Sequence, residues 1–471
     1  MDAQVTSDFK GVRVCVAGLG VSGPPAARAL LAHGAEVTVV DGGDDEGRRT
    51  AAAELERLGA RVRLGGGATL PEGTELVVTS PGWRPDAPLL VAAAEAGLPV
   101  LGDVELAWRL RPPGQAWLAV TGTNGKTTTV RMLAEMLLAD GRRAVAAGNV
   151  GTSLVDVVTA EPAYEVVAVE LSSFQLHWSS TVVPYAGTVL NVAPDHIDWH
   201  GDLEAYAADK GRVYAPGTIA VANADDELSV RLADQAREPA ARAAFTLGTP
   251  RPGELGVVED LLVDRAFVDD PERTAEELGT LADVVPYAPH NVANALAAAA
   301  LARAYGVAPG SVRAGLRAFR PDPHRMTAVA TLGEVGYVDD SKATNPHAAA
   351  ASLAAYDSIV WIAGGLLKGA DVDDLVAVAA GRLRAAVLLG ADRARIADAL
   401  HRHAPHVPII EVPETEPRAA MEAAVHAARA AAHPGDTVLL APAAASLDMY
   451  RNYNVRGDTF TDLVRGLTPK H

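Results

Sequence analysis

The chain has 471 residues, of which 49% are hydrophobic and 21% charged. This length and composition exclude an intrinsically disordered chain and a mini-protein, and they predict about three domains. The 41 basic and 59 acidic residues give a net charge of −18, which disfavours general binding to nucleic acids or anionic membranes. Cys15 is the only cysteine, so intrachain disulfides and multi-cysteine metal sites are excluded.

The N-terminal residues lack the basic start and apolar core of a signal peptide. No stretch offers the roughly 20 apolar residues of a membrane span. We therefore expect a cytoplasmic monomer that binds small molecules, with no nucleic-acid partner and no membrane span. Only six of the basic residues are lysines. Where arginine is the general cation, an interior lysine is expected to be present because its primary amine is needed.

The predicted elements alternate between short apolar runs and helix-like stretches, which is typical of an α/β fold with parallel sheets. In the N-terminal part we expect strands at 12–17, 36–40 and 76–79, and helices at 24–33 and 89–96. A break at 111–114, rich in proline and glycine, ends this part.

The alternation resumes after the break and continues to a second break at 320–323. Between the breaks we expect strands at 118–120, 166–169, 189–192 and 219–221, and a long alanine-rich helix at 291–305. The last third has expected strands at 336–338, 359–362, 386–389 and 438–440. The sequence thus predicts a third α/β unit.

The first glycine-rich motif, Gly18-Leu19-Gly20-Val21-Ser22-Gly23, follows an apolar strand, and Asp41 ends the next strand. In a dinucleotide-binding turn, glycines let the backbone approach a pyrophosphate and the acid meets a ribose hydroxyl. A strand-to-helix turn without a ligand is the alternative. The acidic run at 42–46 offers no cation to a phosphate, which disfavours NADP.

The second motif, Gly122-Thr123-Asn124-Gly125-Lys126-Thr127-Thr128, follows the strand expected at 118–120. Such a loop cradles phosphates with backbone N–H groups, while the lysine reaches the β- and γ-phosphates and the threonine ligates Mg²⁺. Val120 stands where a strict P-loop has glycine, which indicates a variant loop. The motif predicts a nucleotide site.

Two further segments place metal-ligating residue types near this loop. Glu170 ends the strand expected at 166–169, where Mg²⁺ beside a P-loop needs a carboxylate. His196 and His200 are four residues apart and raise the alternative of zinc, but Pro194 favours a loop there and the sequence offers no third ligand. Lys210 follows them.

Polar residues also gather at later strand ends and at one helix start, which is the usual ligand side of an α/β sheet. These segments are 290–294, 323–325, 339–346, 364–369 and 445–457. Taken in order over nearly the whole chain, the motifs resemble the Mur ligases of peptidoglycan synthesis. Segments 172–176 and 340–345 resemble the branch that adds D-glutamate, because other branches typically have a histidine where Phe174 stands.

The resemblance implies three domains. They are an N-terminal Rossmann-like UDP-binding domain at 1–113, a central P-loop ATPase-type domain at 114–320, and a C-terminal Rossmann-like domain at 321–471 that contacts ATP and the amino acid. It further implies an ATP-dependent ligase that joins UDP-N-acetylmuramoyl-L-alanine to D-glutamate through an acyl phosphate. The loop at 18–23 would then serve the diphosphate of a UDP-sugar instead of a dinucleotide.

The resemblance also implies a role for each motif residue. Catalytic roles fall on Lys126, Glu170, His196, Lys210 and Asn149. Thr127 and Glu170 would hold one Mg²⁺, and His196 with a carbamylated Lys210 would hold a second, because a carbamate is an oxygen donor that suits a hard cation.

The implied binding residues fall into three groups. ATP would contact Gly122, Thr123, Asn124, Gly125, Lys126, Thr127, Thr128, Asn291, Asn294, Arg325, Asp340 and Lys342. D-glutamate would contact Thr344, Lys368, Ser446, Leu447 and Tyr453, with Lys342 beside them. The UDP-substrate would contact Gly18, Gly20, Val21, Ser22, Asp41, Ser80, Pro81, Gly82, Asn149, Ser172 and Gln175.

Three other functions remain open at this point. A dinucleotide-dependent oxidoreductase explains the motif at 18–23 but not the P-loop. A P-loop ATPase acting as a switch or motor explains Lys126 but not Lys210 or the C-terminal segments. A ligase similar to folylpolyglutamate synthase is the nearest alternative of the same class.

Overall fold

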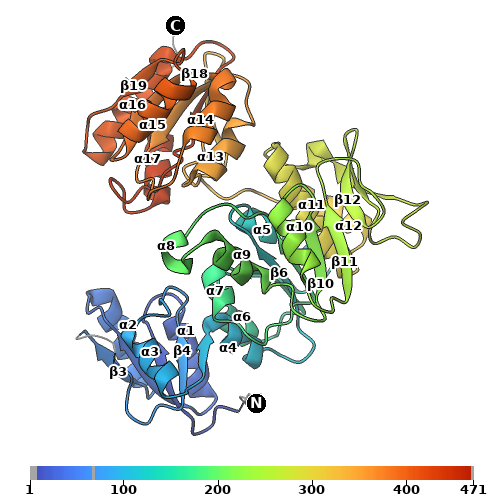
Figure 1. The fold of residues 1–471 in the computed structure, drawn as a ribbon, viewed down its shortest axis with the longest axis vertical. Coiled ribbons are helices and arrows are strands. Elements are labelled where there is room, and N and C mark those ends of the chain that lie inside the picture. Colours follow the sequence, from blue (N-terminus) through green and yellow to red (C-terminus); the bar gives the residue numbers. More distant parts are fainter. Residues whose placement is uncertain (1–7, 66–68, 150, 468–471) are drawn as a thin grey trace. The chain divides into compact units, whose positions relative to one another are not determined.

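The computed structural model describes residues 8–65, 69–149 and 151–467, and these residues form three separate β-sheets (Figure 1). By internal contacts the chain divides into two compact units. The first comprises the residues up to 283 together with 293–318, and the second comprises 284–292 and 319–471. The first unit contains two of the sheets and the second unit contains the third.

The N-terminal sheet has five parallel strands in the order β3-β2-β1-β4-β5. Its strands are β1 (Arg13–Ala17), β2 (Glu36–Asp41), β3 (Arg61–Leu64), β4 (Leu76–Thr79) and β5 (Val100–Gly102). Its helices are α1 (Gly23–Ala32), α2 (Glu46–Arg57), α3 (Pro88–Glu95) and α4 (Asp103–Leu110). Pro24 and Pro25 lie in the first turn of α1, where the missing N–H of a proline does no harm.

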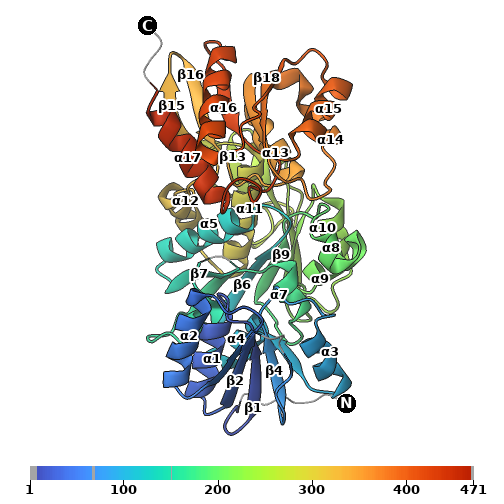
Figure 2. The same cartoon turned by 90° about the vertical axis from the view of Figure 1, so that its left-hand side faces the viewer.

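Strand β1 is apolar on both faces because helices cover both sides of this sheet (Figure 2). Val14 and Val16 belong to the core that includes residues of α1, whereas Cys15 and Ala17 belong to a second core that includes residues of α3. This arrangement presents the carboxyl end of β1, followed directly by the glycines at 18–23, at one edge of the sheet.

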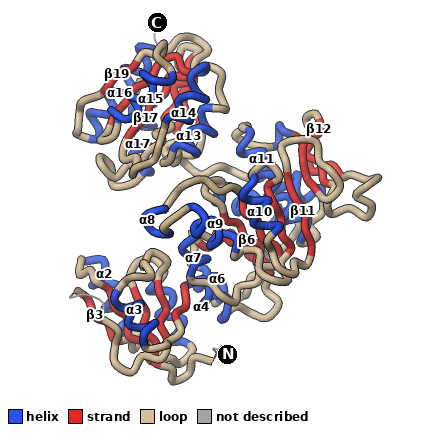
Figure 3. The backbone as a smooth tube through the Cα atoms, in the orientation of Figure 1, coloured by secondary structure: helices blue, strands red, loops and turns tan. Residues whose placement is uncertain are grey.

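The second sheet has nine strands in the order β14-β13-β12-β11-β10-β9-β6-β8-β7. Its strands are β6 (Ala116–Thr121), β7 (Ala144–Gly148), β8 (Val166–Glu170), β9 (Ala186–Val189), β10 (Ile219–Asn223), β11 (Ala241–Phe245), β12 (Glu254–Val258), β13 (Leu261–Asp264) and β14 (Glu276–Thr280). Helices flank it on both faces (Figure 3). They are α5 (Lys126–Ala139), α6 (Leu154–Val158), α7 (Ser173–His177), α8 (Ile197–His200), α9 (Leu203–Gly211), α10 (Glu227–Asp234), α11 (Pro289–Ala304) and α12 (Pro309–Ala318).

Two expectations for this region need correction. The strand expected at 189–192 is wrong in its bounds, since β9 ends at Val189 and the following apolar residues form a loop that bonds to the turn at 122–125. The sheet is also not parallel throughout, because β12, β13 and β14 pair antiparallel. The two-residue connection between β12 and β13, at 259–260, is short enough for an antiparallel hairpin.

The first two sheets are held together within one compact unit. Glu105 on α4 is fully buried, and its Oε2 accepts hydrogen bonds from the backbone N–H groups of Ser180 and Thr181, both at 2.9 Å. The break expected at 111–114 lies between α4 and β6, and the break at 320–323 lies between α12 and β15. The domain boundaries themselves stay a prediction.

The third sheet has six strands in the order β15-β16-β20-β17-β18-β19. The strands are β15 (Thr327–Leu332), β16 (Val335–Asp339), β17 (Ile359–Gly364), β18 (Leu383–Leu389), β19 (Ile409–Glu411) and β20 (Thr437–Leu440). The helices are α13 (Pro346–Leu353), α14 (Asp373–Ala379), α15 (Arg393–His403), α16 (Pro417–Ala431) and α17 (Tyr453–Arg465). All pairs are parallel except β15 with β16. Within the described residues, none of the helices is both long and apolar enough to cross a membrane.

Candidate active site

The turn between β6 and α5 has the geometry of a phosphate-binding loop. Gly125 has a φ of +88°, and a Cβ there would lie 2.3 Å from Oδ1 of Asn294, so only glycine fits. Helix α5 starts at Lys126, and no described side chain caps its first turn. Because the N–H groups at a helix start attract anions, this turn is a suitable phosphate site.

Two lysines converge on this turn. Nζ of Lys126 donates to the carbonyl oxygens of Gly122, at 2.8 Å, and Thr123, at 2.9 Å. Nζ of Lys210, on α9, donates to the same Gly122 oxygen at 2.8 Å. Lys210 is only 1% exposed, and its burial, reinforced by the charge of Lys126, holds its pKa well below the ordinary lysine value. A buried lysine amine with a lowered pKa therefore lies beside the phosphate loop.

Glu170 closes the site from the neighbouring strand. Strand β8 pairs with β6 in parallel, with Glu170 opposite Val120. The carboxyl group is buried, and Nδ2 of Asn149 donates to its Oε1 at 3.0 Å. Oε2 is buried as well and has no hydrogen-bond partner among the described residues. Because a buried carboxylate oxygen needs a partner, this atom fits a cation.

The donor set near the turn suits Mg²⁺ better than zinc. Among the described residues, no three histidine, cysteine or carboxylate side chains are grouped to hold a metal ion by themselves. Mg²⁺ commonly binds through one or two carboxylates together with substrate phosphates and water. Thr127, which is buried in the first turn of α5, and Glu170 could supply such ligands.

His196 lies among aromatic side chains. It has a φ of +53°, unusual for a residue other than glycine, and its ring contacts Phe174 edge-on at 4.8 Å between centroids. The other histidine of this segment is occupied, because Nδ1 of His200 lies 3.0 Å from Asp209 Oδ2 and Nε2 lies 2.9 Å from Ser173 Oγ. The zinc alternative therefore has no support from His200.

The glycines at 18–23 form a tight turn into α1. A Cβ on Gly23 would lie 1.9 Å from the Gly18 carbonyl oxygen, so glycine is required. Oδ2 of Asp41 accepts the N–H of Leu19 at 2.6 Å, and Oδ1 accepts the N–H of Gly43 at 2.7 Å and Nε of Arg48 at 2.8 Å. Asp41 thus holds this turn together.

Arg48 corrects the expectation that no cation lies near the acidic run at 42–46. It projects from the first turn of α2 back over Gly43, whose Cβ would lie 2.7 Å from Arg48 Nε. The motif did not predict the position of the Arg48 side chain. Arg48 follows the acidic run in sequence, and only the geometry of α2 brings its side chain back to the turn. Arg48 is a candidate ligand-binding residue that the motif analysis missed.

The other expected UDP contacts lie around the same turn. A Cβ on Gly18 would lie 2.7 Å from Ser80 Oγ, so the segment 80–82 packs on the turn. Oγ of Ser22 donates to Oδ2 of Asp103 at 2.9 Å. Asp103 is buried, which raises the pKa of its carboxyl group, and the Gln175 side chain offsets this rise in part. The structure thereby brings Ser22 and Gln175 to one carboxyl group, which the motif analysis missed.

Ser172 and Gln175 cap α7. Oγ of Ser172 accepts the N–H of Gln175 at 3.2 Å, and Oε1 of Gln175 accepts the N–H of Ser172 at 3.0 Å. This capping box fixes the start of the helix directly after Glu170.

Asn291 and Asn294 both lie on α11. Asn294 lies against Gly125, whereas Nδ2 of Asn291 donates to the Pro286 carbonyl oxygen at 3.0 Å.

In the second compact unit, Asp340 is buried and largely engaged within the fold. Its Oδ1 accepts the N–H of Met326 at 3.2 Å, and its Oδ2 accepts a hydrogen bond from Ser352 Oγ. Burial raises the pKa of Asp340 to about 6. Nε of Arg325 lies 3.8 Å from Asp322 Oδ2.

Three C-terminal loops, at 340–345, 364–369 and 443–447, lie together and carry the residues expected to bind D-glutamate. Leu366 and Ala445 exchange backbone hydrogen bonds of 2.8 and 2.9 Å, which joins two of the loops. The N–H of Ala443 bonds to the Ala343 carbonyl at 3.0 Å, which joins the third. Nζ of Lys342 lies 4.0 Å from the centroid of the Tyr453 ring.

The expected side chains on these loops differ in exposure. Leu447 is 61% exposed, whereas Ser446 is buried. Lys368 has a φ of +51°.

Comparison with known proteins agrees with this arrangement. Residues 120–302 match the Mur ligase middle domain, and residues 324–444 match the domain described as Mur ligase, glutamate ligase domain. The chain is 65% identical to a protein from Thermobifida fusca named UDP-N-acetylmuramoylalanine--D-glutamate ligase, over 98% of this chain and 99% of that protein. A protein of the same name from Streptomyces avermitilis is 63% identical, with the same shares covered.

The fold also has a counterpart among solved structures. The UDP-N-acetylmuramate-alanine ligase MurC of Thermotoga maritima superposes with a TM-score of 0.56 at 20% identity, covering 96% of this chain and 99% of that chain. This similarity and the matched domains confirm the expected α/β fold class, in which three parts of the chain are each built around a β-sheet. Because full-length relatives exceed 60% identity, the resemblance inferred from the motifs is confirmed, and the chain belongs to the Mur ligase family.

Proposed function

We propose that this protein joins the L-alanyl carboxylate of UDP-N-acetylmuramoyl-L-alanine to the amine of D-glutamate, using ATP, in the synthesis of peptidoglycan precursors. The identity of 65% over nearly the full length to a ligase of that name is the observation that carries the proposal. The phosphate loop with two lysines and a buried carboxylate supports it, because activation of a carboxylate by ATP requires charge neutralisation around the transferred phosphoryl group.

In the proposed reaction, the substrate carboxylate attacks the γ-phosphorus of ATP and ADP leaves. The resulting acyl phosphate is attacked at its carbonyl carbon by the amine of D-glutamate, and the C–O bond to phosphate then breaks. The N–H groups at the start of α5 and the Lys126 ammonium bind the phosphates and offset their charge. Asn149 orients Glu170 by donating to Oε1, which leaves Oε2 for a cation.

Mg²⁺, when bound, supplies charge neutralisation and a fixed orientation for the phosphate oxygens. Thr127 and Glu170 are the residues proposed to hold it. Carbamylation of Lys210 and a second Mg²⁺ ligated by His196 are finer proposals. The burial of Lys210 supports the first, because a neutral amine is the form that adds to CO₂ and burial lowers the pKa of this amine.

The remaining sites are assigned by the family. The turn at 18–23, with Ser80–Gly82, Asn149, Ser172 and Gln175, is proposed for the UDP-substrate. Asn291, Asn294, Arg325, Asp340 and Lys342 are proposed for ATP, and the three C-terminal loops with Tyr453 for D-glutamate. The corresponding domain bounds are 1–113, 114–320 and 321–471.

Phosphate release measured with each substrate omitted in turn tests the proposal. We expect release to require ATP, the UDP-substrate and D-glutamate together, because the acyl phosphate has no productive exit without the amine. L-glutamate should fail, since a pocket that holds both carboxylates would direct its amine away from the carbonyl carbon. Full release with ATP alone would support a simple ATPase, and release with a folate substrate would support the folylpolyglutamate synthase alternative.

The oxidoreductase alternative is tested by thermal protection. A UDP-nucleotide that binds the native protein should raise its melting temperature, whereas NAD at the same concentration should do little. Equal protection by NAD would contradict the assignment of the turn at 18–23.

A further inference from the structure

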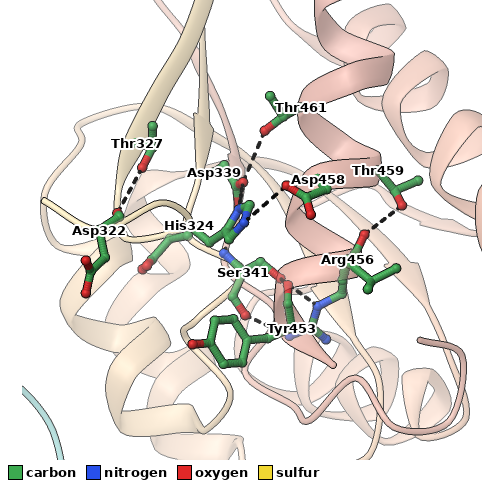
Figure 4. A network of polar contacts seen from close by, with 12 residues as sticks. Asp322, His324, Thr327, Asp339, Ser341, Tyr453, Arg456, Asp458, Thr459 and Thr461 are labelled. Carbon is green, nitrogen blue, oxygen red and sulfur yellow. Dashed lines mark hydrogen bonds and ion pairs between the residues drawn. The ribbon is translucent and has the colours of Figure 1, made fainter. Parts of the chain in front are cut away.

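A single buried side chain, Arg456 on α17, bonds to all three C-terminal loops. Figure 4 shows it beside Ser341 of the first loop. Arg456 is 2% exposed. Nε donates to Ser341 Oγ at 3.0 Å and Nη2 to the Ser341 carbonyl oxygen at 2.9 Å. Nη1 donates to the carbonyl oxygens of Ala444, at 3.1 Å, and Gly364, at 3.4 Å. The four acceptors belong to all three loops.

Each acceptor lies close in sequence to a residue proposed to bind D-glutamate. Ser341 directly precedes Lys342, Ala444 lies two residues before Ser446, and Gly364 begins the segment that leads to Lys368. Oγ of Ser341 also donates to the Tyr453 carbonyl oxygen at 2.8 Å, which ties the start of α17 to the same point. The guanidinium therefore holds the backbone of each loop close to the residues that form the proposed D-glutamate pocket.

The chemistry of this contact requires arginine. All four acceptors are neutral oxygens, so the guanidinium is held without the compensation that a bonded carboxylate would give. Burying such a cation is costly, and burial lowers the pKa of Arg456 to about 10. The planar fork directs several donors at fixed angles, which a lysine ammonium cannot reproduce. Space is also limited, because a Cβ on Gly365 would lie 3.3 Å from Nη1.

We propose that Arg456 is a positioning residue for D-glutamate, which sets the relative spacing of the three C-terminal loops without touching the substrate. This proposal rests on the proposed function. Loss of the multiple contacts should loosen the pocket and weaken binding of the amino acid, while the phosphate loop, built on another sheet, should keep its geometry.

The test is the steady-state kinetics of Arg456→Lys, with each substrate varied in turn. We expect the KM for D-glutamate to rise about 10-fold or more, because hydrogen bonds from a charged donor are lost. The KM for the UDP-substrate, whose proposed contacts lie in the first compact unit, should stay within about 2-fold, a difference too small to reflect a lost contact of this kind. Arg384→Lys is the matched control, since Arg384 pairs with Asp436 at 2.5 Å near the starts of β18 and β20.

Melting temperature and circular dichroism distinguish a local effect from misfolding. If Arg456→Lys does not fold, Ser341→Ala replaces it, because this variant removes one acceptor and the bond to Tyr453 while leaving the guanidinium in place. An equal rise in the KM values for D-glutamate and the UDP-substrate, or a fall in kcat with the KM for D-glutamate unchanged, would overturn the proposal. Wild-type protein in the same assay tests the proposed function separately, because it must require D-glutamate whatever the variant does.

Discussion

The two glycine-rich turns of the first compact unit share a backbone design but differ in charge. Both follow a parallel strand and lead into a helix. The turn at 18–23 is closed by the carboxylate of Asp41, which accepts the N–H of Leu19. The turn at 122–125 is closed by two lysines, which bond to its carbonyl oxygens. Glycine spacing therefore predicts the turn, whereas the charge that closes it indicates the ligand.

This difference agrees with the proposed division of labour. A triphosphate needs cations, and the ammonium group of Lys126 lies at the turn at 122–125. The N–H groups of Thr123 and Asn124 in this turn bond to the neutral Asn191 and not to an acid. At 18–23 one N–H is already used by an acid, and the nearby cation, Arg48, is bonded to that same acid. Such a turn suits the less charged part of a nucleotide-sugar better than a triphosphate.

The largest effect is expected from the cation that contacts the second turn most extensively. Lys126→Ala should lower kcat/KM by about 100- to 1,000-fold, because a charge aimed at the transferred phosphoryl group is lost. Lys10→Ala, at an exposed lysine of the same unit, is the control and should be neutral. A comparable loss in both variants would show that the assay reports general charge instead of this site.

A similar loss is expected from the second lysine, for a different reason. Lys210→Arg keeps a positive charge but cannot form a carbamate, so turnover should fall by about 100-fold or more if the oxygen donor is needed. Removal of CO₂ and bicarbonate should slow the wild-type protein, and their return should restore it but not the variant. A variant with near-normal turnover and unchanged Mg²⁺ dependence would remove the carbamate from the mechanism.

A smaller effect is expected at the first turn. Asp41→Asn weakens three hydrogen bonds at once, and the KM for the UDP-substrate should rise about 10-fold while the KM for ATP stays constant. The control is Asp86→Asn, which removes an exposed ion pair with Arg84 and should be nearly neutral. A fall in the KM for the UDP-substrate in Asp41→Asn would show instead that the acid repels the diphosphate and does not support the turn.

The smallest effect is expected in the second unit, on the free energy of unfolding, where His324 lies between two carboxyl groups. Nδ1 of His324 lies 2.6 Å from Asp339 Oδ2, and Nε2 lies 3.4 Å from Asp458 Oδ1. Figure 4 shows the histidine between the two acids. The bond to Asp339 raises the pKa of His324 above its ordinary value of 6.5. A raised pKa means that the folded state binds the proton more tightly, so this stabilisation is full below 6.5 and is lost as the pH rises through the folded value.

His324→Gln should therefore lower the free energy of unfolding by about 1 to 2 kcal/mol at pH 5.5, and by less at pH 8.5. Thermal melts of both proteins at the two pH values measure this. A difference that grows toward high pH would show that the histidine is held in its neutral form.

The local signals in the sequence predicted the second turn and its strand-end acid well. Lys126 and Thr127 follow from spacing, and Glu170 follows from its place after an apolar strand. The bounds of β9 were wrong because the apolar run continues past the sheet, into a loop that bonds to the phosphate turn. Periodicity cannot distinguish these two uses of apolar residues.

The features that were not predicted depend on contacts between distant segments. Asp103, which was missed, bonds to Ser22 across 81 positions. Arg456 lies in the expected segment 445–457, but its bond to Ser341 across 115 positions follows from no spacing pattern. Arg48 is near in sequence to Asp41, but only the geometry of α2 returns its side chain to the turn.

The central claim is that ATP activates the substrate carboxylate by forming an acyl phosphate. Transfer of ¹⁸O from the L-alanyl carboxylate of the UDP-substrate tests it most directly, because the bridging oxygen leaves with phosphate when the amide bond forms. Mass spectrometry of the released phosphate should find one ¹⁸O atom per molecule in the presence of D-glutamate. Phosphate without ¹⁸O would contradict the claim, since water and not the carboxylate would then have attacked ATP.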